Sequence, residues 1–194
     1  MRRFYAPPES FGENGITLDA DETRHLRDVL RLKISDEVSV FDGMGREFRC
    51  SIREFTKRNS TLELIEETPP ASPESPLEIT VAATVLNGDK YDLIIQKAVE
   101  LGVTALIPLI TIRGDVKVKD AAKRLERWRR IALEATKQCG RAKLMLISEP
   151  TEFKDLITGV LDRDVIMFSE RDGSDSKGLV VGNKLTVLYG PKGG

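Results

Sequence analysis

The sequence predicts a two-part fold, with a small β-barrel over residues 1–68 and an α/β domain with a parallel sheet over residues 77–194. Before residue 68, short segments alternate apolar and polar side chains, which is typical of half-buried strands. After residue 77, apolar strands alternate with helical patterns, which indicates a parallel sheet with helices on both faces. Residues 69–76 separate the two patterns. Four of the nine residues in 68–76 are prolines, so we expect a linker there.

The first part contains four strand candidates and one short helix. The strand candidates are Gly15–Leu18, Glu37–Phe41, Glu47–Phe55 and Thr61–Glu66. Asp21 is the predicted N-cap of a helix that extends to about Leu30. Asp42-Gly43-Met44-Gly45 has the composition of a hairpin turn. Several short strands within about 65 residues favour a small barrel.

The second part alternates strands with helices. We expect helices from Lys90 to Leu101, from Ala121 to Cys139 and from Glu152 to Leu161, with Gly102 and Gly140 ending the first two. The expected strands are Leu77–Leu86, Val103–Leu109, Leu144–Ile147, Asp164–Phe168 and Lys184–Tyr189.

A glycine loop follows the last of these strands. Gly190-Pro191-Lys192-Gly193-Gly194 comes directly after an apolar run, and glycines let the backbone approach a ligand closely. Ligands of open α/β sheets bind at the carboxyl ends of the strands, so we expect a ligand site here. The loop lacks P-loop spacing, and no GxGxxG follows the first strand of the domain, so a Rossmann-type site is unsupported.

Composition excludes several classes of protein. No apolar run approaches the roughly 18 residues of a membrane span, and the N-terminus lacks the apolar region of a signal peptide. Cys50 and Cys139 are far apart, so we expect reduced thiols in a cytoplasmic protein without a membrane partner. One histidine and two separate cysteines make a metal site unlikely to form, and we expect none.

Positive charge is concentrated in one segment. Residues 117–143 hold ten basic and three acidic residues, a net charge of +7, which leaves −8 on the rest of a chain whose total is −1. Such a stripe indicates an anionic partner. A solvated helix face is the alternative interpretation.

Three single residues are candidates for a site. Arg113 follows the second strand of the α/β domain, where functional residues are common. Arg141 follows a helix end, where it either grips a phosphate or carboxylate or caps the last carbonyls. His25 is the only histidine, and a lone histidine is more often structural than functional.

The chain resembles the RsmE family, the ribosomal RNA small subunit methyltransferase E family. The resemblance covers essentially the whole chain and rests on motifs in a fixed order: RFY (3–5), HLRDVLR (25–31), VFDG (40–43), IQKAVELGV (95–103), EATKQCGR (134–141) and YGPKGG (189–194). It implies a PUA-like RNA-binding barrel followed by a SPOUT domain with a C-terminal trefoil knot. It also implies that a homodimer methylates N3 of a uridine in 16S rRNA with S-adenosylmethionine, with no DNA partner.

The resemblance also assigns site residues. The cofactor is expected against Phe168, Ser169, Glu170, Tyr189, Gly190, Pro191, Gly193 and Gly194. Arg113 is the candidate catalytic residue, as a cation beside the uracil oxygens. The RNA is expected to contact Arg2, Arg3, His25, Arg27, Arg31, Lys90 and Arg141, together with the basic stripe.

Two departures from the family pattern affect these expectations. Lys192 stands where the family usually has glutamate. Family members also continue past the glycine loop with a segment that forms the knot and closes the cofactor pocket, so we expect the knot-forming tail to be absent from this chain. A chain with such an incomplete pocket is expected to bind S-adenosylmethionine weakly or not at all. A non-catalytic RNA-binding protein is therefore the alternative function.

Overall fold

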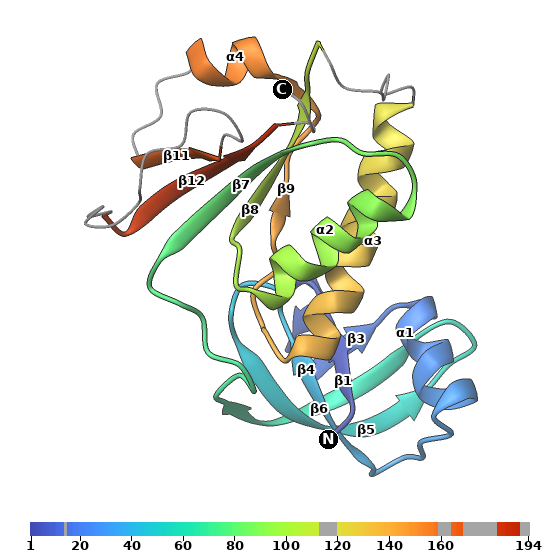
Figure 1. The fold of residues 1–194 in the computed structure, drawn as a ribbon. Coiled ribbons are helices and arrows are strands. Elements are labelled where there is room, and N and C mark those ends of the chain that lie inside the picture. The colour runs from blue at the N-terminus through green and yellow to red at the C-terminus, as the bar shows by residue number, and fades with distance from the viewer. Residues whose placement is uncertain (14, 113–119, 159–163, 169–181, 191–194) are drawn as a thin grey trace. The chain divides into compact units, whose positions relative to one another are not determined.

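The computed structural model describes residues 1–13, 15–112, 120–158, 164–168 and 182–190 (Figure 1). The chain divides into two compact units. The first unit contains Met1–Glu74 and Thr136–Leu144, and the second contains Ser75–Ala135 and Met145–Gly194. One division falls between Glu74 and Ser75, inside the segment expected to be a linker, and a second falls within a long helix.

The first unit is built on a six-stranded sheet in the order β1-β4-β5-β6-β3-β2. Its pairs are antiparallel except for β1 and β4, which run parallel. The four predicted strands are confirmed, whereas β1 and β2 were missed because two or three residues are too few to show a period. The strands are β1 (Arg3–Tyr5), β2 (Phe11–Gly12), β3 (Gly15–Leu18), β4 (Glu37–Phe41), β5 (Glu47–Phe55) and β6 (Ser60–Thr68).

Short helical segments complete this unit. A 3₁₀ turn, η1 (Pro8–Ser10), precedes β2, and α1 (Ala20–Arg24) continues into a π-helical turn, η2 (His25–Val29). The predicted N-cap was wrong by two residues. The Asp19 side chain accepts a hydrogen bond from the Glu22 amide at 2.9 Å, because the helix begins at Ala20, while Asp21 pairs with Arg24 on the exposed face.

The core of the first unit forms from the inward positions of the strands. Phe48, Cys50 and Ile52 of β5 are buried, as their period of two predicted. Burial raises the pKa of the Cys50 thiol to about 12, which keeps it uncharged in the core. The same cluster includes Phe4, Ile16, Leu18, Leu26, Val38, Val40 and Leu62.

The second unit contains a parallel sheet, as predicted. The strands follow the order β10-β8-β7-β12-β11, with β9 beside β8, and every pair is parallel. Parallel strands require crossover connections, and three of these contain a helix: α2 (Asp89–Glu100) follows β7, α3 (Ala121–Cys139) follows β8, and α4 (Phe153–Thr158) follows β10. The strands are β7 (Glu78–Thr84), β8 (Ala105–Ile110), β9 (Leu146–Ile147), β10 (Thr151–Glu152), β11 (Asp164–Phe168) and β12 (Lys184–Tyr189).

The helices are α2 (Asp89–Glu100), α3 (Ala121–Cys139) and α4 (Phe153–Thr158). Leu156 of α4 packs with Ala82, Leu109 and Leu188 of the sheet, whereas Tyr91 of α2 contacts Trp128 of α3 with ring centroids 4.9 Å apart. No helix within the described residues is long and apolar enough to cross a membrane.

Candidate functional site

Strand order in the second unit places a candidate site at one edge of the parallel sheet. The carboxyl ends of β7, β8, β11 and β12 meet at this edge, because all of these strands run parallel. From β7 the chain continues to β8 on one side, while β12 and β11 occupy the other side. The edge beside β7 and β12 is therefore a topological switch point, where open α/β sheets bind ligands.

An aromatic pair marks this edge. Phe168 ends β11, Tyr189 ends β12, and the two residues are directly paired in the strand register. Their rings stack 5.0 Å apart with planes only 5° from parallel. Phe168 is 58% exposed and Tyr189 is 46% exposed, so the stacked pair presents a flat aromatic surface rather than a core contact.

A hydrogen bond from the neighbouring strand β7 fixes the backbone at the end of β12. The Thr84 hydroxyl, at the end of β7, donates a hydrogen bond to the Tyr189 carbonyl at 3.2 Å. Gly190 follows and is exposed, and apart from its chain neighbours no heavy atom of the described residues lies within 4 Å of the place that a Cβ would take. The first residue of the glycine loop thus leaves open space beside the aromatic pair.

The structure brings together three of the predicted cofactor residues, Phe168, Tyr189 and Gly190. The other cofactor candidates and the catalytic candidate lie outside the described residues: Ser169, Glu170, Pro191, Gly193, Gly194 and Arg113. Among the described residues, no group of histidine, cysteine, aspartate and glutamate side chains could hold a metal ion.

Arg3 occupies an internal position in the first unit. Its Nε and Nη2 donate to the two carboxylate oxygens of Glu47, both at 2.9 Å. Its guanidinium also donates to three carbonyls at the end of α3, those of Thr136, Lys137 and Arg141, at 2.9–3.1 Å. Arg3 therefore caps the helix, and its donors are used within the unit. This placement favours a structural role over the expected contact with RNA.

Two cations of the basic stripe form ion pairs within the first unit. Arg141 grips the Glu74 carboxylate with two hydrogen bonds, of 3.0 and 2.7 Å, and its side chain is 4% exposed. Of the roles expected for Arg141, these contacts correspond to the carboxylate grip. Lys137 forms an ion pair with Glu22, and both side chains are largely buried. The C-terminal part of the stripe therefore stabilises the unit.

The remaining RNA candidates lie at the surface. Arg2, His25 and Arg31 are exposed in the first unit, and Lys90 is exposed in the first turn of α2. Arg27 forms two hydrogen bonds to Asp28, which lower the pKa of that carboxyl, and donates to the Thr56 carbonyl at 3.2 Å.

Sequence reasoning missed two exposed cations beside Arg27. Lys57 and Arg58 form the tip of the β5–β6 hairpin, directly after Thr56. Two long strands flank them, and this turn position was the signal that could have identified them.

Comparison with known proteins agrees with this arrangement. Residues 73–194 match the RNA methyltransferase domain, and residues 18–65 match the RNA methyltransferase PUA domain. The ribosomal RNA small subunit methyltransferase E of Bacillus subtilis is 30% identical over 190 residues, which cover 92% of this chain and 74% of the relative. The chain belongs to the ribosomal RNA small subunit methyltransferase E family. The resemblance of its motifs to this family is thereby confirmed.

Other members and solved structures extend the match. The Aquifex aeolicus member is 32% identical, over 100% of this chain and 82% of its own. The Neisseria gonorrhoeae member, solved bound to S-adenosyl methionine, superposes with a TM-score of 0.86 at 31% identity, covering 100% of this chain and 81% of that one. A methyltransferase from Legionella pneumophila, solved in complex with the cofactor SAM, has a TM-score of 0.85 at 27% identity, with the same coverage.

Proposed function

We propose that the protein transfers a methyl group from S-adenosylmethionine to N3 of a uridine in the 16S rRNA of the small ribosomal subunit. The observation that carries this proposal is the exposed Phe168–Tyr189 stack at the switch-point edge of a family member's parallel sheet. Relatives named for small subunit rRNA methylation, and two neighbours solved with the same cofactor, support it.

The residues at this edge fit the cofactor. S-adenosylmethionine supplies a methyl group on a positively charged sulfur, and its adenosine carries a planar aromatic base. Phe168 and Tyr189 offer an aromatic surface for such a base, and the exposed backbone at Gly190 offers groups for hydrogen bonding. We assign the rest of the site to Ser169, Glu170, Pro191, Gly193 and Gly194, which lie outside the described residues.

The target atom determines what the protein must add. N3 of neutral uracil carries a proton and is a poor nucleophile, so the reaction requires loss of that proton and stabilisation of the developing anion. We assign the stabilising role to Arg113, which follows β8 in the sequence, three residues after Ile110. A guanidinium remains charged throughout the accessible pH range and presents several donors to the uracil oxygens.

We assign RNA binding in the PUA unit to basic residues at its surface. Arg2, His25, Arg27 and Arg31 keep the role expected of them, and the hairpin tip at Lys57 and Arg58 extends the same charge. Phosphate contacts by such residues position an RNA without reading its sequence. In the other unit, Lys90 remains a candidate contact.

Further parts of the proposal concern architecture and assembly. We assign the second unit to the SPOUT class of trefoil-knot methyltransferases, and its parallel sheet supports this assignment. We propose a homodimer because β11 lies at an end of the strand order with apolar side chains that are poorly covered, Val165 at 44% and Met167 at 60% exposure. A ribosomal substrate would place the enzyme in the cytoplasm.

Two measurements test the proposed function. Titration calorimetry should detect binding of S-adenosylmethionine to the purified protein. Methyl transfer should then occur to small subunits from cells that lack this modification, with N3-methyluridine as the product by mass spectrometry. Binding of RNA without binding of the cofactor would instead support a non-catalytic RNA-binding protein, and methylation of another atom would contradict the assigned chemistry.

A further inference from the structure

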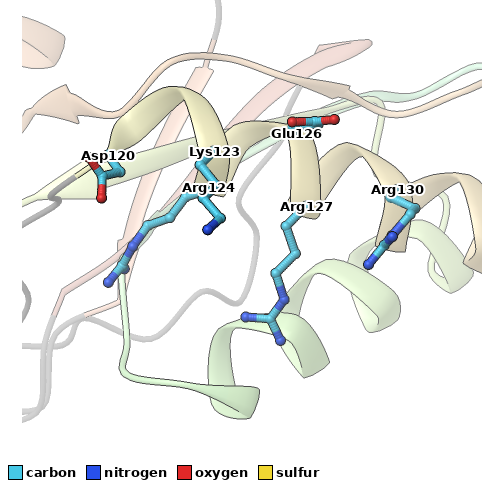
Figure 2. A pocket seen from close by; sticks show the side chains of 6 residues that line it. All are labelled: Asp120, Lys123, Arg124, Glu126, Arg127 and Arg130. Atoms are coloured by element: carbon cyan, nitrogen blue, oxygen red, sulfur yellow. The ribbon is translucent and has the colours of Figure 1, made fainter.

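The N-terminal half of α3 borders an open hollow of about 620 Å³ in the second unit. Every lining residue that the structure describes is charged, and Figure 2 shows these side chains from close by. They are Asp120, Lys123, Arg124, Glu126, Arg127 and Arg130. Four cations against two anions make this hollow a site for a negatively charged ligand.

The cations form a row along one side of the helix. Lys123, Arg127 and Arg130 are spaced by four and three residues, so they share a helix face. Figure 2 shows Arg124 projecting to the same side as these three, whereas Glu126 projects from the other side of α3. The buried residues Leu125 and Ala132 lie on the opposite face, at helical spacing from the row. From residue 123 to residue 130 the row rises about 10 Å, at 1.5 Å per residue.

One member of the row is anchored and the others are available. Arg127 forms an ion pair with Asp92 of α2, and Asp89 lies 3.9 Å away. Within the described part of the chain, Lys123, Arg124 and Arg130 form no such pair. Carboxylates therefore neutralise mainly the middle cation of the row, Arg127.

We infer that this hollow binds the phosphodiester backbone of the RNA substrate, an inference that rests on the proposed function. Donors spread along about 10 Å match a ligand whose negative charges repeat along its length, as the phosphates of an RNA strand do. A compact anion would instead require donors that converge on one point. Four of the ten cations in the basic stripe line this hollow and are assigned to RNA, whereas Lys137 and Arg141 are used internally.

The test compares two double variants that each remove two positive charges. Lys123→Ala/Arg130→Ala removes the ends of the row, and Lys154→Ala/Lys184→Ala removes two exposed cations elsewhere in the same unit. Binding of a short single-stranded RNA of mixed sequence is measured by fluorescence anisotropy at several salt concentrations. Affinity falls as salt rises, so the slope of log affinity against log salt is negative. In the row variant this slope should become shallower by about 1.4, or about 0.7 for each lost phosphate contact, whereas the control should keep its slope.

Two further readouts separate this inference from the proposed function. The conservative swap Lys123→Arg/Arg130→Lys keeps the charges and should keep the slope, while S-adenosylmethionine affinity should be equal in all variants. With small subunits as substrate, the row variant should raise KM and leave kcat unchanged.

An unchanged slope in the row variant, or an equal loss in the control, would overturn the inference. If the row variant bound RNA normally but no longer bound an acidic protein that the unsubstituted protein binds, the hollow would be assigned to a protein partner instead. Failure of the proposed function would instead abolish cofactor binding and methylation in the unsubstituted protein.

Discussion

Arg3 and Glu47 form a two-pronged ion pair in the first unit, with Nε to Oε1 and Nη2 to Oε2 both at 2.9 Å. The same guanidinium donates to the Lys137 carbonyl, 134 positions further along the sequence, and lies 4.8 Å from the centre of the Phe41 ring. A residue of the first strand thus holds the end of α3, which the sequence would place in the other part of the fold.

Replacing Arg3 should therefore destabilise the first unit strongly. Arg3→Met removes the helix cap and leaves Glu47, a residue 4% exposed, as a buried carboxylate without its cation. Breaking such a pair costs about 3–5 kcal/mol. Urea unfolding followed by circular dichroism measures the loss.

The control for Arg3 is an exposed pair on the same sheet. Arg46 donates to Glu67 with the same two-pronged geometry, but both side chains are more than half exposed. Arg46→Met should change the free energy of unfolding by about 1 kcal/mol or less. Equal losses in the two variants would show that burial does not govern the Arg3 pair.

The same pair predicts a dependence of stability on pH. Burial by itself would raise the pKa of Glu47, but hydrogen bonds from Arg3 and Ser39 hold it below its ordinary value. A carboxyl with a lowered pKa stabilises the fold above its unfolded pKa, and this contribution disappears as the pH falls through the folded pKa. The difference in unfolding free energy between the unsubstituted protein and Glu47→Gln should shrink as the pH falls below about 4.5. A difference that is constant from neutral to acidic pH would contradict the assignment.

Tyr189 is expected to contribute to cofactor binding through its ring. Tyr189→Phe keeps the stack on Phe168 and should bind S-adenosylmethionine with little change in Kd. Tyr189→Ala removes the aromatic surface and should weaken binding roughly tenfold, about 1.4 kcal/mol. Calorimetry on the two variants measures both values, and a loss in Tyr189→Phe as large as in Tyr189→Ala would assign the effect to the hydroxyl.

Gly140 and Gly102 form a matched pair for measuring backbone strain against crowding. Both follow a helix end with positive φ, 87° at Gly140 and 84° at Gly102. A Cβ on Gly140 would lie 3.2 Å from the Ala71 Cβ, whereas one on Gly102 would meet no atom within 4 Å in the part of the chain that the structure describes, chain neighbours aside. Gly102→Ala should therefore cost about 1 kcal/mol from φ alone, and Gly140→Ala more than that. Thermal unfolding tests this order, and an equal cost in both variants would exclude crowding.

The local pattern of the sequence was enough to predict most of the elements. Period-two alternation identified β5, helical spacing identified α3, and Gly102 marked the end of α2. Each of these signals depends only on residues that are close together in the sequence, so it can be recognised without knowledge of the tertiary structure. The motifs together also indicated the family, because their order and spacing extend over the chain.

Other features depend on contacts between distant parts of the chain, and only the tertiary structure decided them. The sequence showed Arg3 and Arg141 only as two of the thirty lysines and arginines of the chain, yet Glu47 and Glu74 bind them internally. The Phe168–Tyr189 stack likewise required β12 to lie beside β11 in parallel register. Charge and spacing along a sequence predict which residues are able to bind an anion, but only folding decides which of them a buried carboxylate or a helix end already occupies.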